Sequence, residues 1–186
     1  MVKKSLFFLI LFLLPFEIYA QGEKPAQLRI FEEPKSKEWW FRTEFLAAGS
    51  SIREIPAHEI DPTWHYASEL TKDAIPKKLL LRDGADLMNE TEITFSRSGD
   101  FNNDGIDDLA LVGVYEDCNL QTGRFFLILT KNKLNKWEVS FLRLLGEPKF
   151  LAISASGPLK ISFCMECEET FHLLWSSEKN EYTLKP

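Results

Sequence analysis

The chain has 186 residues, of which 45% are hydrophobic, so it is long enough and apolar enough to bury a globular core. It carries 22 Lys and Arg residues against 28 Asp and Glu residues, which gives a formal net charge of −6 at pH 7. An acidic chain without a basic run interleaved with aromatic residues repels phosphate backbones, so we expect no nucleic-acid partner.

Residues 1–20 have the pattern of a secretory signal peptide. Lys3 and Lys4 form a basic start, the apolar run Leu6–Phe16 follows, and a short segment ends at the small residue Ala20. The run is shorter than the roughly 20 apolar residues that a membrane-spanning helix needs. We therefore expect cleavage after Ala20, with an uncleaved anchor as the alternative. The mature protein is predicted to be exported, periplasmic or secreted, without a stable membrane span.

The next segment, residues 21–38, is predicted to be a polar lead-in to the globular domain. It contains two prolines and allows at most a short strand around Leu28–Phe31. A single globular domain is expected over residues 39–186, because a mature chain of this length fits one domain. Its first part, residues 39–91, is predicted to mix strand and helix, beginning with a strand that ends at Gly49.

A short helix is predicted for the stretch "DPTWHYASELTKDA". Asp61 is a candidate N-cap, and Pro62 follows at the first helical position. Apolar side chains then recur at helical spacing at Trp64, Ala67 and Leu70.

Residues 92–186 are predicted to form an antiparallel β meander. The runs that indicate strands are "EITFSRSG", "DDLALVGVYED", "GRFFLILTKN", "KWEVSFLRLLG", "PLKISFC", "ETFHLLWSS" and "EYTLKP". They are rich in β-branched and aromatic residues, and the segments between them have turn chemistry. The expected fold class is therefore mainly β, with an α+β N-terminal part.

An acidic loop stands immediately before one of these strands, in "SGDFNNDGIDDLALVGVY", residues 98–115. Oxygen donors recur at alternate positions and form what we call the predicted ligand set: Asp100, Asn102, Asp104, Ile106 (through its carbonyl) and Asp108. Gly105 in sixth place permits the sharp turn that wraps such oxygens around a hard cation such as Ca²⁺. An ion would also relieve the repulsion among the carboxylates, which is about 1 kcal/mol per pair at 4 Å in water.

The segment "GDFNNDGIDDLAL" resembles the loop of FG-GAP and VCBS-type repeats, integrin-like extracellular modules whose D-x-[DN]-x-D-G-x-x-D motif binds calcium between strands of propeller blades. The resemblance implies that the predicted ligand set binds calcium, and it gives Asp107 no ligand role. It is limited to this loop, and the twelfth position, Leu111, departs from an EF-hand. A propeller needs several four-stranded blades. We therefore expect an antiparallel meander resembling one propeller blade or a small sandwich, not a complete propeller.

A plain hairpin turn is the alternative interpretation of the same loop. "DG" favours a tight turn, and Asn and Asp side chains accept hydrogen bonds from their own backbone. In that case the loop would need no ion.

The three cysteines are candidates for one disulfide, because an exported protein reaches an oxidising compartment. A bridge from Cys118 to Cys164 or Cys167 would stabilise the fold by about 3–4 kcal/mol. A bridge within "CMEC", between Cys164 and Cys167, is the rival pairing. A zinc site that adds His172, or a redox role for "CMEC", are further alternatives.

Two further histidines and three of the five tryptophans are predicted to be structural. His58 and His65 do not have the spacing of a known metal set, so we expect them to be solvated. The tryptophans Trp39, Trp40 and Trp64 are expected to build the core rather than a sugar-stacking face.

No catalytic motif accompanies the acidic loop. The sequence lacks a nucleophile elbow, a phosphate-binding loop, a dinucleotide glycine pattern and an H-E-x-x-H motif. We therefore expect an exported, calcium-stabilised β domain that is a non-catalytic binding or envelope-associated module for an unknown protein or glycan partner. The alternatives are a small exported hydrolase with structural calcium, or a periplasmic thiol protein that uses Cys164 and Cys167.

Overall fold

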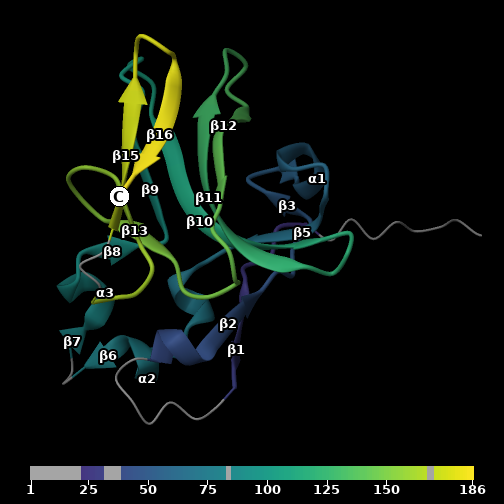
Figure 1. Ribbon diagram of the computed structural model, residues 1–186, viewed down its shortest axis with the longest axis vertical. Helices are drawn as coiled ribbons and strands as arrows, with labels where there is room; N and C mark the ends of the chain where they lie inside the picture. The colour runs from purple at the N-terminus through teal and green to yellow at the C-terminus, as the bar shows by residue number, and fades with distance from the viewer. Residues whose placement is uncertain (1–21, 32–38, 83–84, 167–169) are drawn as a thin grey trace, which may run out of the picture.

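The computed structural model describes residues 22–31, 39–82, 85–166 and 170–186. Within these residues, two five-stranded antiparallel sheets and three two-stranded sheets account for most of the regular structure (Figure 1). The mainly β class expected from the sequence is confirmed. The predicted signal peptide lies outside the described residues.

The first five-stranded sheet is built on two long strands, β10 (Asp108–Asp117) and β11 (Thr122–Lys131). Its order is β12-β11-β10-β5, where β12 is Trp137–Leu144 and β5 is Trp64–Glu69. The strand β9 (Ser96–Gly99) also pairs with β10, so β5 and β9 occupy different halves of the same β10 edge. Strands β9 to β12 are consecutive and antiparallel, as the meander prediction requires.

Strands β10 and β11 are buried on both faces, which explains why their sequences are almost continuously apolar. Successive side chains of a strand point to opposite faces of the sheet. In β10, Ala110, Val112 and Val114 accordingly belong to the larger core, whereas Leu109 and Leu111 belong to a second, smaller cluster. The central strands are thus covered by different parts of the chain on their two sides.

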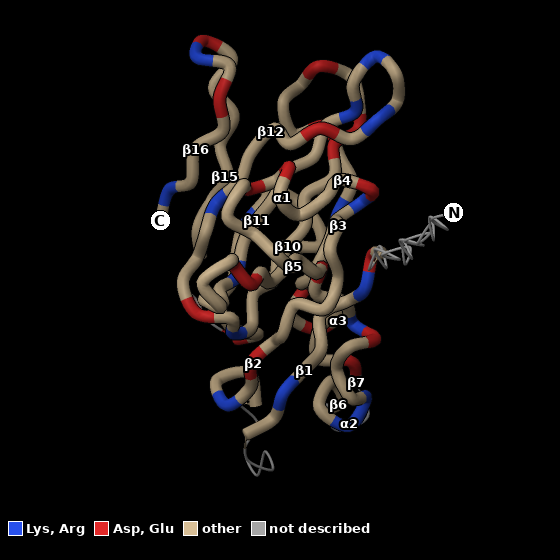
Figure 2. The backbone as a smooth tube through the Cα atoms, turned by 90° about the vertical axis from the view of Figure 1, so that its right-hand side faces the viewer, with Lys and Arg blue, Asp and Glu red and all other residues tan. Residues whose placement is uncertain are grey.

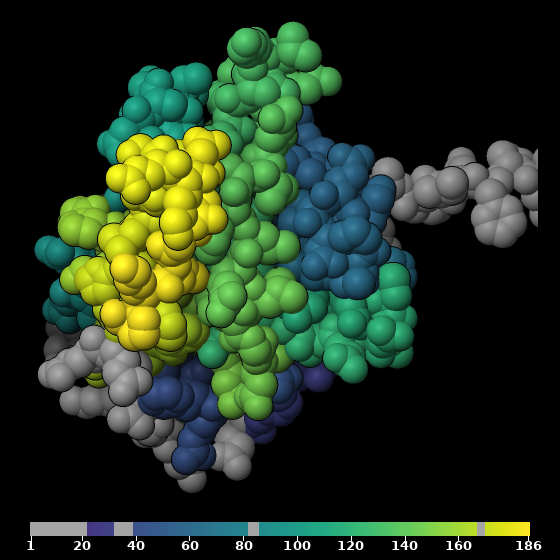
Figure 3. Space-filling model, turned by 45° about the horizontal axis from the view of Figure 1, so that its top comes forward, coloured from purple at the N-terminus to yellow at the C-terminus, as the bar shows by residue number. Residues whose placement is uncertain are grey.

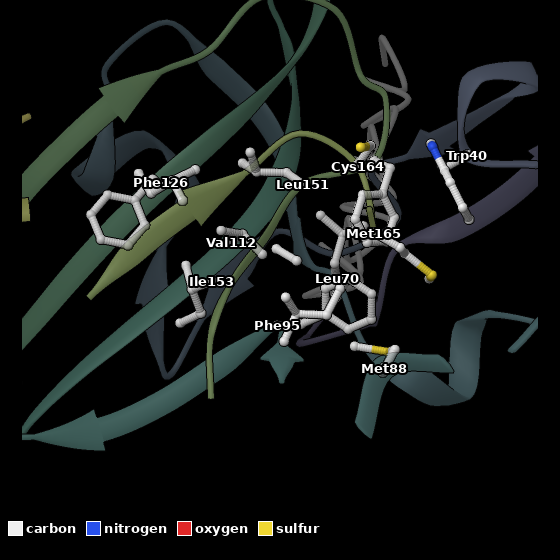
Figure 4. Packing of buried hydrophobic residues seen from close by; sticks show 14 of the residues in the cluster. Trp40, Leu70, Met88, Phe95, Val112, Phe126, Leu151, Ile153, Cys164 and Met165 are labelled. Carbon is white, nitrogen blue, oxygen red and sulfur yellow. The ribbon is translucent and has the colours of Figure 1, made fainter. Parts of the chain in front are cut away.

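The second five-stranded sheet has the order β16-β15-β14-β13-β8. Its strands are β8 (Ile93–Thr94), β13 (Ala152–Ser154), β14 (Lys160–Ser162), β15 (Thr170–Ser176) and β16 (Glu181–Lys185). The larger core joins the two sheets: Figure 4 shows Val112 and Phe126 of the first sheet in one cluster with Ile153 of the second. The arrangement is that of a small sandwich, and the described residues form no closed barrel or propeller.

The N-terminal part contributes short hairpins and single helical turns. Its elements are β1 (Gln27–Ile30), η1 (Trp39–Arg42), β2 (Thr43–Leu46), β3 (Ser51–Ile52), β4 (Ile55–Pro56), α1 (Ala57–Ile60), η2 (Lys72–Ala74), α2 (Lys77–Leu80), β6 (Leu81–Arg82), β7 (Ala85–Asp86) and α3 (Leu87–Glu90). Figures 1 and 2 agree that α2, β6 and β7 lie at one end of the molecule, while the hairpins β11–β12 and β15–β16 extend towards the other.

The described part of the lead-in is paired and partly buried, and the first predicted strand of the domain is shorter than expected. The short strand predicted near Leu28 is present as β1, which pairs with β2. Ala26 just before it is buried, and its backbone N–H donates to Glu69 O at 2.9 Å. The residues expected to form one strand up to Gly49 instead form the turn η1, followed by the strand β2, which ends at Leu46.

The helix predicted after Asp61 is wrong, because Trp64–Glu69 forms the strand β5. The Asp61 side chain accepts the N–H and the hydroxyl of Thr63 at 2.9 and 2.7 Å, and Trp64 N donates to Asp61 O at 3.0 Å. These bonds close a turn at Pro62 instead of starting a helix. None of the described helices is long and apolar enough to span a bilayer.

Candidate metal centre

The acidic loop is the tip of the β9–β10 hairpin. The pairing of Gly99 with Asp108 brings its two ends together, so residues 100–107 form the connection. Gly105 has a φ of +84°, and Asn103 has a φ of 61°. The left-handed region is open to glycine and tolerated by asparagine, so the residue types suit this turn.

The loop wraps inward around Asp100. The two carboxylate oxygens of Asp100 accept the backbone N–H groups of Asp104 and Gly105 at 3.1 and 2.9 Å. Asn102 Oδ1 also accepts Asp104 N at 2.9 Å, and Asp104 Oδ1 accepts Ile106 N at 2.8 Å. Asn102 Nδ2 donates to Asp104 Oδ2 at 2.9 Å. Three members of the predicted ligand set are therefore held side by side.

Asp108 differs from the other acidic residues because it is completely buried. Its Oδ2 accepts Phe101 N and the hydroxyl of Tyr182, both at 3.1 Å. Its Oδ1 is buried and has no hydrogen-bond partner. A buried carboxylate oxygen of this kind is costly unless a donor or a cation compensates it.

Burial also sets the electrostatics around Asp108. Burial raises the pKa of the Asp108 carboxyl, the bonds from Phe101 and Tyr182 oppose the rise, and the charges of Asp104 and Asp100 add to it. Burial likewise raises the pKa of the Tyr182 hydroxyl, and the neighbouring Asp108 charge raises it further. Tyr182 therefore remains a neutral hydrogen-bond donor to Asp108 at ordinary pH.

The donor chemistry of the loop suits a hard cation, since every member of the predicted ligand set offers oxygen. Among the residues that the structure describes, however, no three His, Cys, Asp or Glu side chains lie close enough together to hold a metal ion. The plain-turn alternative accounts for the hydrogen bonds within the loop. It leaves Asp108 Oδ1 without a hydrogen-bond partner.

The last member of the set, Ile106, and its neighbour Asp107 lie at the surface of the loop. Ile106 is 48% exposed, with its N–H held by Asp104. Asp107, which the resemblance leaves without a role, is exposed.

Sequence reasoning missed Tyr182, the hydroxyl donor to Asp108, which comes from β16 in the other sheet. No local pattern links two residues so far apart in the chain.

The cysteines do not lie together in the part of the chain that the structure describes. Cys118 carries a free, exposed thiol in the turn after β10, whereas Cys164 is buried in the larger core. Cys167 lies outside the described residues. A bridge from Cys118 is therefore not formed in this structure, and the pairing within "CMEC" stays a prediction.

The histidines and tryptophans occupy ordinary positions. His58 and His65 are exposed, and His172 is a partly buried residue of β15. Trp39 and Trp40 belong to the larger core, and Trp64 stacks on Tyr115 with ring centroids 4.8 Å apart. These tryptophans build the core, as expected.

The resemblance of the loop to FG-GAP and VCBS-type repeats stays a prediction. In comparisons with known proteins, the chain matches no family model, no curated sequence and no solved structure.

Proposed function

We propose that the protein is an exported β domain that binds Ca²⁺ at the acidic loop and is a non-catalytic binding or envelope-associated module. The observation that supports a cation is Asp108 Oδ1, a buried carboxylate oxygen without a partner. An uncompensated buried charge destabilises a protein by several kcal/mol, of order 3–5 when a partner is removed. A cation at this corner would remove that penalty.

The predicted ligand set would hold the ion. When bound, Ca²⁺ supplies positive charge that offsets the repulsion among the carboxylates. The chain itself wraps the loop around Asp100 and joins Asp108 to Tyr182 of the second sheet. An ion that orders the loop would therefore also stabilise the contact between the two sheets.

Export is proposed from the residue pattern of positions 1–20. Extracellular modules bind calcium at about 10⁻⁴ to 10⁻³ M, and we expect an affinity in that range. At tenfold excess of calcium over the dissociation constant, linkage predicts stabilisation of about 1.4 kcal/mol. For a domain of this size, that corresponds to a melting temperature higher by about 3–5 °C.

The first test is a thermal melt of the purified protein in calcium and in chelator. We expect calcium to raise the melting temperature of the wild type. The melting temperature of Asp104→Ala should not respond to calcium, because Asp104 is one of the three residues held side by side. In chelator the substitution should cost less than in calcium, because Asp104 is exposed and its bonds to Ile106 N and Asn102 lie within the loop. Asp107→Asn removes a neighbouring exposed charge outside the ligand set, so it should keep the full response.

Two outcomes would contradict this proposal. Equal destabilisation by Asp104→Ala in calcium and in chelator would show that the residue only shapes a plain turn. An absence of any calcium effect on the wild type would remove the ion from the account altogether.

A further inference from the structure

The β3–β4 hairpin contains a strained two-residue turn. Ile52 pairs with Ile55, and the two residues between them, Arg53 and Glu54, have φ values of 48° and 69°. Such turns strongly prefer Gly, Asn and Asp. Non-glycine residues held in the left-handed region concentrate at ligand-binding and active sites. The sequence thus keeps a long, charged side chain where a glycine would be easier to accommodate.

The side chain of Arg53 is held by Glu69 of β5. Arg53 Nε and Nη2 donate to the two carboxylate oxygens of Glu69 at 2.7 and 2.9 Å. Arg53 Nη1 has no hydrogen-bond partner among the described residues. A bidentate pair fixes the plane of the guanidinium, so these remaining donors are oriented and available to a ligand.

Arg53 lines four open hollows. One of about 330 Å³ is also lined by Lys24, Ser51 and Thr71, and one of about 420 Å³ by Glu69 and Asn89. The two larger ones, of about 650 and 580 Å³, share Trp137. These volumes are in the range of small-molecule sites. Figure 3 shows the green hairpin β11–β12 beside the blue segment that contains β3 and α1, the two walls of the larger hollows. We call this surface the Arg53 groove.

Trp137 supplies part of an aromatic ring to the two larger hollows. Trp39, Trp40 and Trp64 are buried, whereas Trp137 packs against the smaller core cluster but stays partly exposed and lines both hollows. Lys131 Nζ lies over its ring, 5.0 Å from the centre, so a sugar would pack against the part of the ring that Lys131 leaves open. Indole rings pack against apolar C–H surfaces while keeping a polar edge in water, which suits the alternating C–H and O–H faces of a pyranose.

The charges of the lining are mixed rather than of one sign. The hollow of about 650 Å³ places the acidic residues Glu54, Glu59 and Glu138 among the basic residues Arg53 and Lys136. The lining therefore favours neither sign of net charge on a ligand. Neighbouring hydroxyls pair with carboxylates as donors and with guanidinium as acceptors, so a neutral polyol fits this lining better than an anion does.

We propose that the Arg53 groove binds a neutral oligosaccharide. Arg53 would hydrogen-bond ring hydroxyls through the guanidinium donors that Glu69 leaves free, and Trp137 would pack against a sugar ring. The site is separate from the acidic loop, so it stands or falls independently of calcium binding there.

The test is titration of the full, ¹⁵N-labelled protein with cellohexaose and chitohexaose, monitored through the tryptophan indole N–H signals. We expect the Trp137 signal, assigned by its loss in Trp137→Phe, to move with saturation. The signals of buried Trp39, Trp40 and Trp64 should stay in place. The titration is repeated in calcium and in chelator, which separates failure of this site from failure of the acidic loop.

Two variants test the groove residues directly. Trp137→Ala and Arg53→Gly should each weaken oligosaccharide binding at least about tenfold, which corresponds to 1.4 kcal/mol. Glycine is chosen at position 53 because it accepts the positive φ. Leu134→Ala and Arg143→Ala change exposed residues of the same hairpin outside the hollows and should bind like the wild type. Melting curves confirm that each variant folds.

Three results would overturn the proposal. The first is no movement of the Trp137 signal at millimolar concentrations of either neutral hexasaccharide. The second is wild-type affinity in folded Trp137→Ala or Arg53→Gly. The third is a response to hexagalacturonate alone, which would show that Arg53 receives a carboxylate and that the ligand is an anion.

Discussion

Asp108 is completely buried, yet one of its carboxylate oxygens has no partner. Its pKa is raised in the folded protein, so without a cation the native state binds a proton more tightly than the unfolded chain does. The resulting stability is fully present below the unfolded pKa near 3.8 and is lost as the pH rises through the folded value. Each pKa unit of that rise corresponds to about 1.4 kcal/mol.

The prediction at this residue concerns Asp108→Asn. In chelator, the melting temperature of the wild type relative to the variant should fall as the pH rises from about 4 to 7, because only the wild type acquires the buried charge. Asparagine keeps an oxygen that accepts the bonds from Phe101 and Tyr182. In calcium at pH 7 the wild type should melt at a higher temperature than the variant, since only the wild type gains from the ion. Melting curves over this pH range, in calcium and in chelator, measure both effects.

A pH-independent difference between the two proteins in chelator would contradict this account of Asp108. A higher melting temperature of the variant in calcium would contradict the proposed role of its charge in binding. Tyr182→Phe is the matched control, because it removes one bond to Asp108 without changing the charge.

Residues that act through neighbours in the chain could be predicted from the sequence. The spacing of Asp100, Asn102 and Asp104 places them on one loop, and the structure brings them into mutual hydrogen bonds. Tyr182 could not be predicted, because its contact with Asp108 depends on how the two sheets pack. The left-handed turn at Arg53 could not be predicted either, since its sequence lacks the usual glycine or asparagine.

At the scale of the elements, β10 shows why one strand was predicted well and its neighbour was not. The apolar run before Asp117 indicates a buried strand under any packing. In β5 and directly after it, the apolar residues Trp64, Ala67 and Leu70 suit a helix equally well. The strand forms because tertiary bonds compete: Ala67 N donates to Gly49 O, and the Ser68 hydroxyl accepts two backbone N–H groups. Local propensity is a weak prior in such places.

The close packing of β5, β10 and β11 leads to a prediction at Gly113. A Cβ atom there would lie 2.4 Å from Ser68 O and 2.4 Å from the Phe125 ring. Because a backbone oxygen cannot move aside, we expect Gly113→Ala to destabilise the fold by about 1–3 kcal/mol or more. Denaturant unfolding measures the loss. Gly22→Ala is the control, since nothing lies within 4 Å of the added atom. Equal stability of the two variants would show that β5 does not approach β10 as described.

At the scale of the whole molecule, the two-sheet arrangement could be predicted only in part. The expected runs account for β9 to β12 and for β14 to β16, because each reads as a strand by itself. The chain returns to the second sheet through β13, which pairs with β8 across about sixty residues of sequence. Such non-local pairing depends on loop closure and core packing, which no short window of sequence reports.

The cysteines give the last prediction, because their places in the molecule separate their reactivities. Cys118 is exposed and free at the end of β10, whereas Cys164 is buried in the core between the sheets. With the proposed bridge between Cys164 and Cys167, a thiol reagent should titrate one thiol per chain, both in the native protein and in denaturant without reductant. Reduction in denaturant should raise the count to three. Cys118→Ser should leave none before reduction, which identifies the reactive residue. Three thiols in unreduced denaturant would exclude the disulfide, and one persistent thiol in Cys118→Ser would show that a different cysteine is free.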